Sequence, residues 1–313
     1  MRPFPVIVLA CLSTAAAPLP AQPRAAPFTV AETGAGFARL ADAVAAIGGG
    51  SGTVLVAPGR YRQCAVQEAG RVAYRARVAG TAVLDGVACE GKAALVLRGR
   101  AARVEGIVFQ NIRVADANGA GIRVEAGDLV VRESLFRDGE NGILAARDHR
   151  GTIRIERSTF SGLGRCPENQ GCSHSIYNSG AGTLIVAQSR FERGTGGHYV
   201  KSRSPRIEIV DSSFDDSAGR GTNYMIDLAN GAAGRIAGNH FVQGADKENY
   251  SAFIAVAPEG AEHSSAGLEV TDNAAAFAPG LRRSAAFVAD ASGEAIVVAG
   301  NRLAPHIVPL ARR

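Results

Sequence analysis

The stretches Glu156-Arg-Ser-Thr-Phe160, Ala187-Gln-Ser-Arg-Phe191 and Val210-Asp-Ser-Ser-Phe214 repeat one phrase along the chain. The phrase is a short alternating apolar strand, then Ser or Asn, then any residue, then a large apolar side chain. It recurs through residues 104–303, and successive phenylalanines at 109, 136, 160, 191, 214 and 241 lie 27, 24, 31, 23 and 27 residues apart. A repeat of this length indicates a solenoid.

The composition of each repeat predicts strands. Segments such as Thr152-Ile-Arg-Ile-Glu156 and Arg206-Ile-Glu-Ile-Val210 alternate with a period of two, and the repeats lack helical spacing long enough for a helix. Coils of roughly 23 residues, with two or three short strands each and stacked about 4.8 Å apart, describe a parallel β-helix. Alignment on the phenylalanines places small polar residues in one column, to which we assign a structural role: Ser134, Ser158, Ser189, Ser212 and Asn239.

The N-terminus has the pattern of a secretory signal. Met1-Arg2 precedes apolar residues 6–12, and small residues continue to Ala21, so we predict a signal peptide over 1–21 and an exported, periplasmic or secreted protein. The apolar run is too short to span a bilayer, and we predict no transmembrane segment. A lipobox-like alternative ending at Cys11 leaves little room for the preceding signal regions.

Four cysteines remain after removal of the signal: Cys64, Cys89, Cys166 and Cys172. An even number in an exported chain predicts disulfides. Cys64 and Cys89 are about one coil apart, and the other two close a short polar loop, so both local pairs are plausible.

A helix is expected at the start of the solenoid. After a linker at 22–35, residues 36–47 have apolar side chains at helical spacing and run into Gly48-Gly-Gly-Ser-Gly, which stops a helix. A helix at 36–47 could cap the open end of the stack. The segment Gly52-Thr-Val-Leu-Val-Ala-Pro-Gly-Arg-Tyr61 then resembles the first coil of the pectate-lyase-like superfamily. This resemblance implies an all-β fold: one single-stranded, right-handed parallel β-helix domain over 36–303, with a C-terminal tail at 304–313.

One strand per coil carries unusual outward residues. The strands within His174-Ser-Ile-Tyr-Asn178, His198-Tyr-Val-Lys-Ser202 and Tyr224-Met-Ile-Asp-Leu228 share a register in which the central Ile or Val points inward. Alternation then turns Tyr199 outward and predicts an exposed ladder of Tyr177, Lys201 and Asp227. Insertions precede the strands at 174–178 and 224–228 and the equivalent strand at 252–256, and they are expected to wall the ladder as a groove: 162–173, 215–223 and 242–251.

The ladder suggests β-elimination of a uronic-acid polymer. That reaction needs a base, a cation that neutralises the carboxylate and an acid for the leaving oxygen. We predict four catalytic residues, with Lys201 as the base, its pKa lowered by Arg203 or a charged imidazole: Lys201, Arg203, Tyr177 and His198. We predict five substrate-binding residues: His174, Tyr199, Asp227, Asn178 and Tyr224. The alternative is a solvated lysine and histidines that bond to corner backbone.

A local phrase has a more specific resemblance. Gly197-His-Tyr-Val-Lys-Ser-Arg203, followed by a strand and Phe214, is similar to the coil that carries the catalytic lysine of the alginate-lyase and chondroitinase-B family. The resemblance implies that Lys201 is the base. The next coil of that family supplies an arginine where this chain has Asp227 and Leu228, so the acid role would fall to Arg203, His198 or Tyr177.

Acidic residues suggest two rival functions. A calcium site could use Asp138, Glu140, Asn141 and Asp148, although Asx-Gly sequences are ordinary turn material, and we predict no metal or other cofactor. A glycosidase would need two carboxyl groups, for which Asp215 with Asp216, or Asp211 with Asp227, could serve. Polygalacturonases of this fold carry Asn-Thr-Asp and Gly-His-Gly coils, and neither phrase occurs here.

The net charge of +5 does not favour nucleic acid, because the arginines are spread along every coil and Trp is absent. We expect a monomer whose partner is an acidic polysaccharide. The leading hypothesis is an exported polysaccharide lyase. The alternative is a non-catalytic glycan-binding or envelope-surface β-helix.

Overall fold

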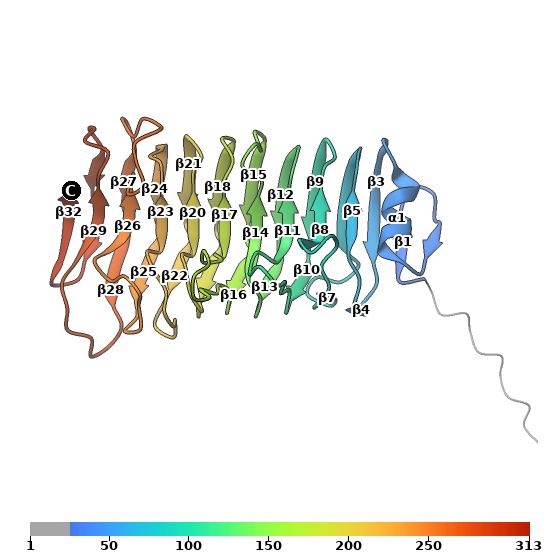
Figure 1. The fold of residues 1–313 in the computed structure, drawn as a ribbon, viewed down its shortest axis with the longest axis horizontal. Helices are drawn as coiled ribbons and strands as arrows, with labels where there is room; N and C mark the ends of the chain where they lie inside the picture. Colours follow the sequence, from blue (N-terminus) through green and yellow to red (C-terminus); the bar gives the residue numbers. More distant parts are fainter. Residues whose placement is uncertain (1–25) are drawn as a thin grey trace, which may run out of the picture.

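The computed structural model describes residues 26–313, and the predicted signal peptide and Cys11 lie outside them. In this part of the chain, strands stack into three sheets along an elongated solenoid, and the two strand pairs that involve residues 28–30 are antiparallel, whereas the strand pairs that follow are parallel (Figure 1). Each coil contributes one strand to each sheet, as the repeat predicts. The fold is therefore a parallel β-solenoid.

We call the three sheets A, B and C. Sheet A has twelve strands, in the order β2 (Gly36–Phe37), β1 (Phe28–Val30), β3 (Ser51–Val56), β6 (Arg71–Ala76), β9 (Ala101–Glu105), β12 (Asp128–Arg132), β15 (Thr152–Glu156), β18 (Thr183–Ala187), β21 (Arg206–Val210), β24 (Ala233–Ala237), β27 (Glu269–Thr271) and β30 (Val297–Ala299). Sheet B has ten strands: β4 (Gly59–Tyr61), β7 (Ala82–Asp85), β10 (Ile107–Gln110), β13 (Leu135–Arg137), β16 (Thr159–Ser161), β19 (Arg190–Glu192), β22 (Ser213–Asp215), β25 (His240–Gln243), β28 (Ala274–Phe277) and β31 (Arg302–Leu303). Sheet C also has ten: β5 (Ala65–Gln67), β8 (Ala93–Leu97), β11 (Ala120–Val124), β14 (Asn141–Ala145), β17 (Ile176–Asn178), β20 (Val200–Ser202), β23 (Ile226–Leu228), β26 (Ala252–Val256), β29 (Ala285–Asp290) and β32 (Ile307–Arg312).

The repeated phenylalanines form a continuous stack on the inner side of sheet B. Neighbouring rings have centroids 4.7–4.9 Å apart and interplanar angles of 2–8°. The spacing matches the rise between parallel strands, so one ring per coil forms an unbroken column along one side of the core. All six side chains are buried: Phe109, Phe136, Phe160, Phe191, Phe214 and Phe241.

The polar column turns the corner between sheets A and B. The backbone N–H of Ser158 donates to Ser189 Oγ at 3.2 Å, and that of Ser212 donates to Asn239 Oδ1 at 2.9 Å. Asn239 in turn donates through its side chain to Asn273 Oδ1 at 3.0 Å. Each coil thus satisfies a buried backbone donor of its neighbour, which confirms the structural role of this column.

Replacing Asn239 by Ala should lower the free energy of unfolding by about 1–3 kcal/mol, because the buried N–H of Ser212 loses its acceptor. Urea denaturation measures the change. The exposed Asn118 offers a matched control, since its replacement by Ala should alter stability by less than about 0.5 kcal/mol. Equal losses of stability at the two positions would contradict the claim that the polar column stabilises the fold.

The chain ends differ from the predicted boundaries. The helix is α1 (Leu40–Ile47), shorter than predicted, because residues 36–37 pair with β1 as strand β2. The expected linker contains β1, which pairs with β3, and the expected tail contains β32, which pairs with β29 in sheet C. Figure 1 places α1 at the β3 end of the stack. Its capping function stays a prediction.

No helix among residues 26–313 has the length and apolar character to cross a bilayer.

Both predicted disulfides are present. Cys64 and Cys89 are bonded with their Cα atoms 5.5 Å apart, and Cys166 is bonded to Cys172 across the short polar loop. Two disulfides are compatible with an extracellular location.

Candidate functional site

The predicted ladder has the predicted register. Tyr177 on β17 pairs with Lys201 on β20, which pairs with Asp227 on β23. The expected exposure of the ladder was wrong, because only 8% of Lys201 and 2% of Asp227 are exposed. Neighbouring side chains cover both residues, so the ladder forms a partly enclosed charged cluster and not a solvated face.

Two carboxylates surround Lys201. Its Nζ lies 3.1 Å from Asp227 Oδ2 and also donates to Glu259 Oε1. Glu259 lies in the turn after β26, a segment that the sequence analysis left unassigned. The second oxygen of Glu259 accepts a hydrogen bond from Arg203 Nη2. One carboxylate therefore bridges the two cations of the site.

These neighbours decide the charge of Lys201. Burial opposes its charge, but Asp227 and Glu259 outweigh that effect and raise the pKa of Lys201 above its ordinary value. The sequence analysis expected a lowered pKa and was wrong, because it considered only the neighbouring cations, left out the effect of Asp227 and did not foresee Glu259. Burial likewise works against the carboxylate form of Glu259, yet Lys201 and Arg203 lower the pKa of Glu259. Lys201 is thus an ammonium at neutral pH.

Arg203 is held by several groups. Its Nε donates to Tyr177 Oη at 2.9 Å, and its Nη1 donates to Asn230 Oδ1. Lys201 Nζ lies 5.9 Å from the centroid of the Tyr177 ring. Within residues 26–313 the Tyr177 hydroxyl accepts this bond and donates to no protein group. Because Tyr177 is only half-buried, its hydroxyl proton is available to a bound molecule.

The two histidines lie behind the cluster. Their rings stack with centroids 5.1 Å apart, and the backbone N–H of His198 donates to His174 Nδ1 at 3.0 Å. His198 Nδ1 lies 3.2 Å from the carbonyl oxygen of Tyr224, and its Nε2 lies 3.3 Å from Asp227 Oδ2. Burial lowers the pKa of both imidazoles, most strongly for His174. Both rings are neutral at pH 7, and their contacts suit positioning better than proton exchange with a substrate.

Asp227 has one oxygen without a partner. Its Oδ2 lies near Lys201 and His198, whereas its Oδ1 is buried and accepts no hydrogen bond from residues 26–313. A buried carboxylate with an unused oxygen costs stability, and the adjacent ammonium compensates its charge. Asp227 therefore depends on Lys201.

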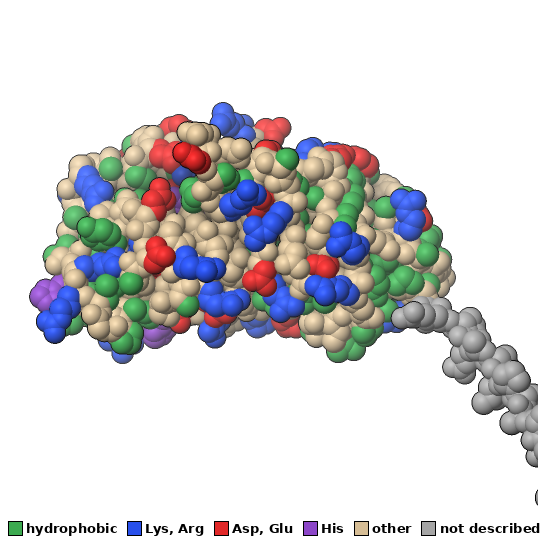
Figure 2. Space-filling model, turned by 60° about the horizontal axis from the view of Figure 1, so that its bottom comes forward, with side chains coloured by type: hydrophobic (Ala, Val, Ile, Leu, Met, Phe, Trp, Pro, Cys, Tyr) green, Lys and Arg blue, Asp and Glu red, His purple; other side chains and the backbone are tan. Residues whose placement is uncertain are grey.

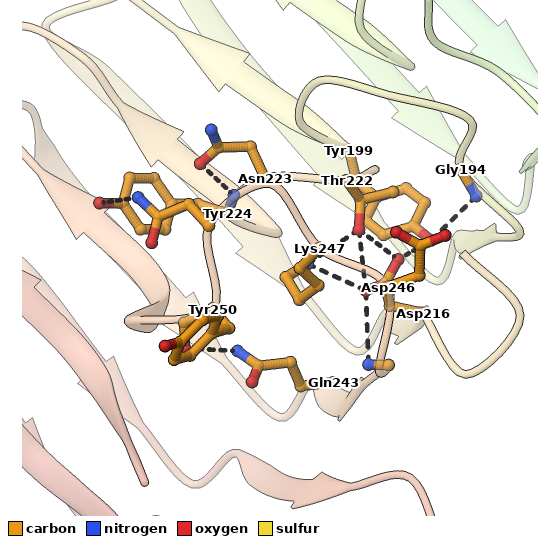
Figure 3. A network of polar contacts seen from close by, with 12 residues as sticks. Gly194, Tyr199, Asp216, Thr222, Asn223, Tyr224, Gln243, Asp246, Lys247 and Tyr250 are labelled. Atoms are coloured by element: carbon orange, nitrogen blue, oxygen red, sulfur yellow. Dashed lines mark hydrogen bonds and ion pairs between the residues drawn. The ribbon is translucent and has the colours of Figure 1, made fainter. Parts of the chain in front are cut away.

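Tyr199 belongs to the scaffold. The expected outward orientation was wrong, because β20 begins at Val200 and strand alternation does not extend to residue 199. Its side chain is buried, donates to Asp216 Oδ1 at 2.8 Å and accepts from the N–H of Gly194 at 3.0 Å (Figure 3). The Tyr199 hydroxyl is therefore engaged within the protein, and its contact with a substrate stays a prediction.

Other residues predicted to bind substrate or calcium also form hydrogen bonds within the protein. Asn178 is buried and donates to Ser204 Oγ, and the Tyr224 hydroxyl accepts from Asn249 Nδ2 at 2.8 Å. Of the calcium candidates, Glu140 Oε2 accepts from two backbone N–H groups, and Asn141 Oδ1 accepts from the N–H of His174. These oxygens organise the coil.

A hollow of about 350 Å³ opens beside Arg203. The turns that follow sheet C strands line it, rather than the insertions that precede them: Arg147, Ser179, Gly180, Ala181, Arg203, Asn230, Glu262 and His263. The expected groove walls lie at the other corner, beside a second hollow of about 430 Å³ that four arginines line: Arg113, Arg165, Arg193 and Arg220. Figure 2 shows basic and acidic side chains interspersed on the face that it presents, without a single basic patch.

Residues 93–276 match the model of the family described as right handed beta helix region. The chain belongs to the right-handed β-helix family. This assignment confirms the predicted architecture and handedness. No curated protein sequence matches this right-handed β-helix.

Two solved structures are similar to this right-handed β-helix protein. ORF18 of Geobacillus virus E2 has 10% sequence identity and a TM-score of 0.45, over 84% of this chain and 54% of the viral chain. The chain thus spans about half the length of the viral protein. The A-module of mannuronan C-5 epimerase AlgE4 from Azotobacter vinelandii has 13% identity and a TM-score of 0.27, over 85% and 92% of the two chains.

Proposed function

We propose that this protein binds an acidic polysaccharide beside sheet C and cleaves it by β-elimination at Tyr177, Lys201 and Arg203. The observation that carries the proposal is the pair of cations bridged by one carboxylate, next to a phenol with an available proton. Neither cation belongs to the phenylalanine stack or to the polar column that joins the coils.

The chemistry of a uronate suits these groups. Neutralisation of its carboxylate by Lys201 and Arg203 makes the adjacent carbon-bound proton more acidic and stabilises the charge that develops when the proton leaves. Tyr177 relays one proton: its hydroxyl gives its proton to the departing glycosidic oxygen while the same oxygen takes the proton from that carbon, so the phenol is protonated again at the end. Arg203 Nε–H donates to this oxygen and offsets the negative charge that develops on it during the exchange. The products are an unsaturated uronate and a free hydroxyl group.

A specific observation supports a second candidate, a glycan-binding protein without catalysis. Lys201 is held as a cation between Asp227 and Glu259, which suits binding of an anion and does not suit the role of a base. A binding protein would use the same two cations and need no proton transfer.

Ultraviolet absorbance of unsaturated uronates distinguishes the two candidates. Purified protein is incubated separately with alginate, pectate, glucuronan and chondroitin, and binding of each polymer is measured in parallel. We expect absorbance to rise with one of them. Binding without any rise would assign the protein to the glycan-binding class, and absence of both would contradict each candidate.

The pH profile tests the role of Lys201. Its pKa is raised, so the ammonium is fully present below 10.5 and is lost only as pH rises through the higher folded value. If Lys201 acts as a cation, kcat/KM should lack an ascending limb as pH approaches 10.5 and should fall at higher pH, as the ammonium is lost. If kcat/KM instead rose with pH in the unaltered protein, and this rise was absent in K201R, Lys201 would be the base.

A further inference from the structure

Glu259 is a carboxylate whose position the fold does not explain. It follows β26 in a turn where Ala257 has a φ of 55°, and its side chain is 41% exposed. Its two oxygens bind Lys201 and Arg203, one cation to each oxygen. A uronate carboxylate that used both cations would make the same two contacts.

Each cation has protein partners besides Glu259. Lys201 contacts Asp227 at 3.1 Å, and Arg203 donates to Tyr177 and Asn230. Only 11% of the Lys201 side chain and 28% of the Arg203 side chain are exposed. The cradle is therefore preorganised for an anion.

Glu259 approaches this cradle from the solvent side. Its carboxylate is more exposed than either cation, so a ligand carboxylate that contacts Lys201 must take its place. The backbone of the turn is fixed, because Glu259 N–H donates to the carbonyl of Ala229 at 3.0 Å and Gly260 N–H donates to that of Ala257 at 3.2 Å. Rotation of one side chain can vacate the cradle without opening the loop. Exchange of one carboxylate for another leaves neither cation unpaired, so it avoids the cost of a lone buried charge.

We propose that Glu259 is a built-in occupant of the subsite for a substrate carboxylate, which a hexuronate must displace in order to bind. The inference rests on the proposed function, because it assigns the subsite to a carboxylate of the polymer. Glu259 thus competes with the ligand carboxylate for Lys201 and Arg203. This competition weakens ligand binding and favours ligands that can contact both cations.

Small carboxylates test the cradle without any cleavage. Isothermal titration would measure the affinity of acetate and of glucuronate for the whole protein and for E259A, which vacates the cradle. We expect both ligands to bind E259A roughly tenfold more tightly than the unaltered protein, because a fixed competing charge is gone. The gain should disappear in E259A/K201M. Glu208, exposed on sheet A, provides the matched charge control, and E208A should leave both affinities unchanged.

An unchanged affinity in folded E259A would overturn the inference. Melting temperature verifies the fold, and E259S serves if E259A is unstable. Cleavage of polymer by the unaltered protein, with no gain of affinity in E259A or E259S, would reject the occupant and keep the lyase. A gain for acetate and glucuronate, with no polymer cleaved, would support the subsite and reject the lyase. A gain of equal size in E208A would also overturn the inference, because it would reflect net charge alone.

Discussion

Replacement of Lys247 by Met should lower the free energy of unfolding by about 3–5 kcal/mol, because it leaves the carboxylate of Asp216 buried without its cation. The Lys247 side chain is 1% exposed, that of Asp216 is 0% exposed, and their charged atoms lie 2.9 Å apart. Thr222 and Tyr199 also donate to Asp216, which joins several corner segments into one network (Figure 3). Urea denaturation measures the loss.

Two further variants separate the buried charge from the loss of side-chain volume. The pair of Arg157 and Glu133 has both side chains 48% exposed, so R157M should cost less than about 1 kcal/mol. The double variant K247M/D216N should recover part of the stability lost in K247M, since it no longer buries a lone charge. If K247M were no more harmful than R157M, the network would not hold the corner.

The variant K201M should lose roughly 10²–10³-fold in kcat/KM on the polymer that the protein cleaves, because the charge that develops on the uronate is no longer neutralised. K201R keeps a cation at this position and should retain activity within about tenfold of the unaltered protein. Initial rates of ultraviolet absorbance give both values. If K201M and K201R lost kcat/KM to the same extent, Lys201 would instead act as a base.

Stability must be measured beside this activity. K201M leaves Asp227 buried without its ammonium, so K201M should also unfold more easily than the unaltered protein. The double variant K201M/D227N removes the lone charge and should recover stability without recovering activity. A stable and fully active double variant would exclude Lys201 from the reaction.

Much of the scaffold could be predicted from the sequence because each coil repeats the same local pattern. One phenylalanine per coil fixed the alignment of sheet B, and the Ser and Asn column followed from that alignment. The pairing of Tyr177, Lys201 and Asp227 followed as well, since parallel strands of a solenoid stay in register with their neighbours.

The surroundings of these residues could not be predicted in the same way. Glu259 is 58 residues from Lys201 in the sequence and reaches it through an irregular turn, for which the repeat gives no register. Asp227 and this contact together reverse the expected pKa shift of Lys201. Tyr199 lies one residue before its strand, so a rule for strand alternation assigned it to the wrong side. The strand β32 lacks the repeated phrase and was therefore assigned to a tail.

A crystal structure with a bound tetrasaccharide of the preferred polyuronate tests the location of the site most directly. We expect one uronate carboxylate to bind Lys201 and Arg203, the side chain of Glu259 to be displaced, and the Tyr177 oxygen to face the carbon next to that carboxylate. Binding in the hollow at Arg113, Arg165, Arg193 and Arg220, with Glu259 still on Lys201, would contradict the placement of the site on sheet C.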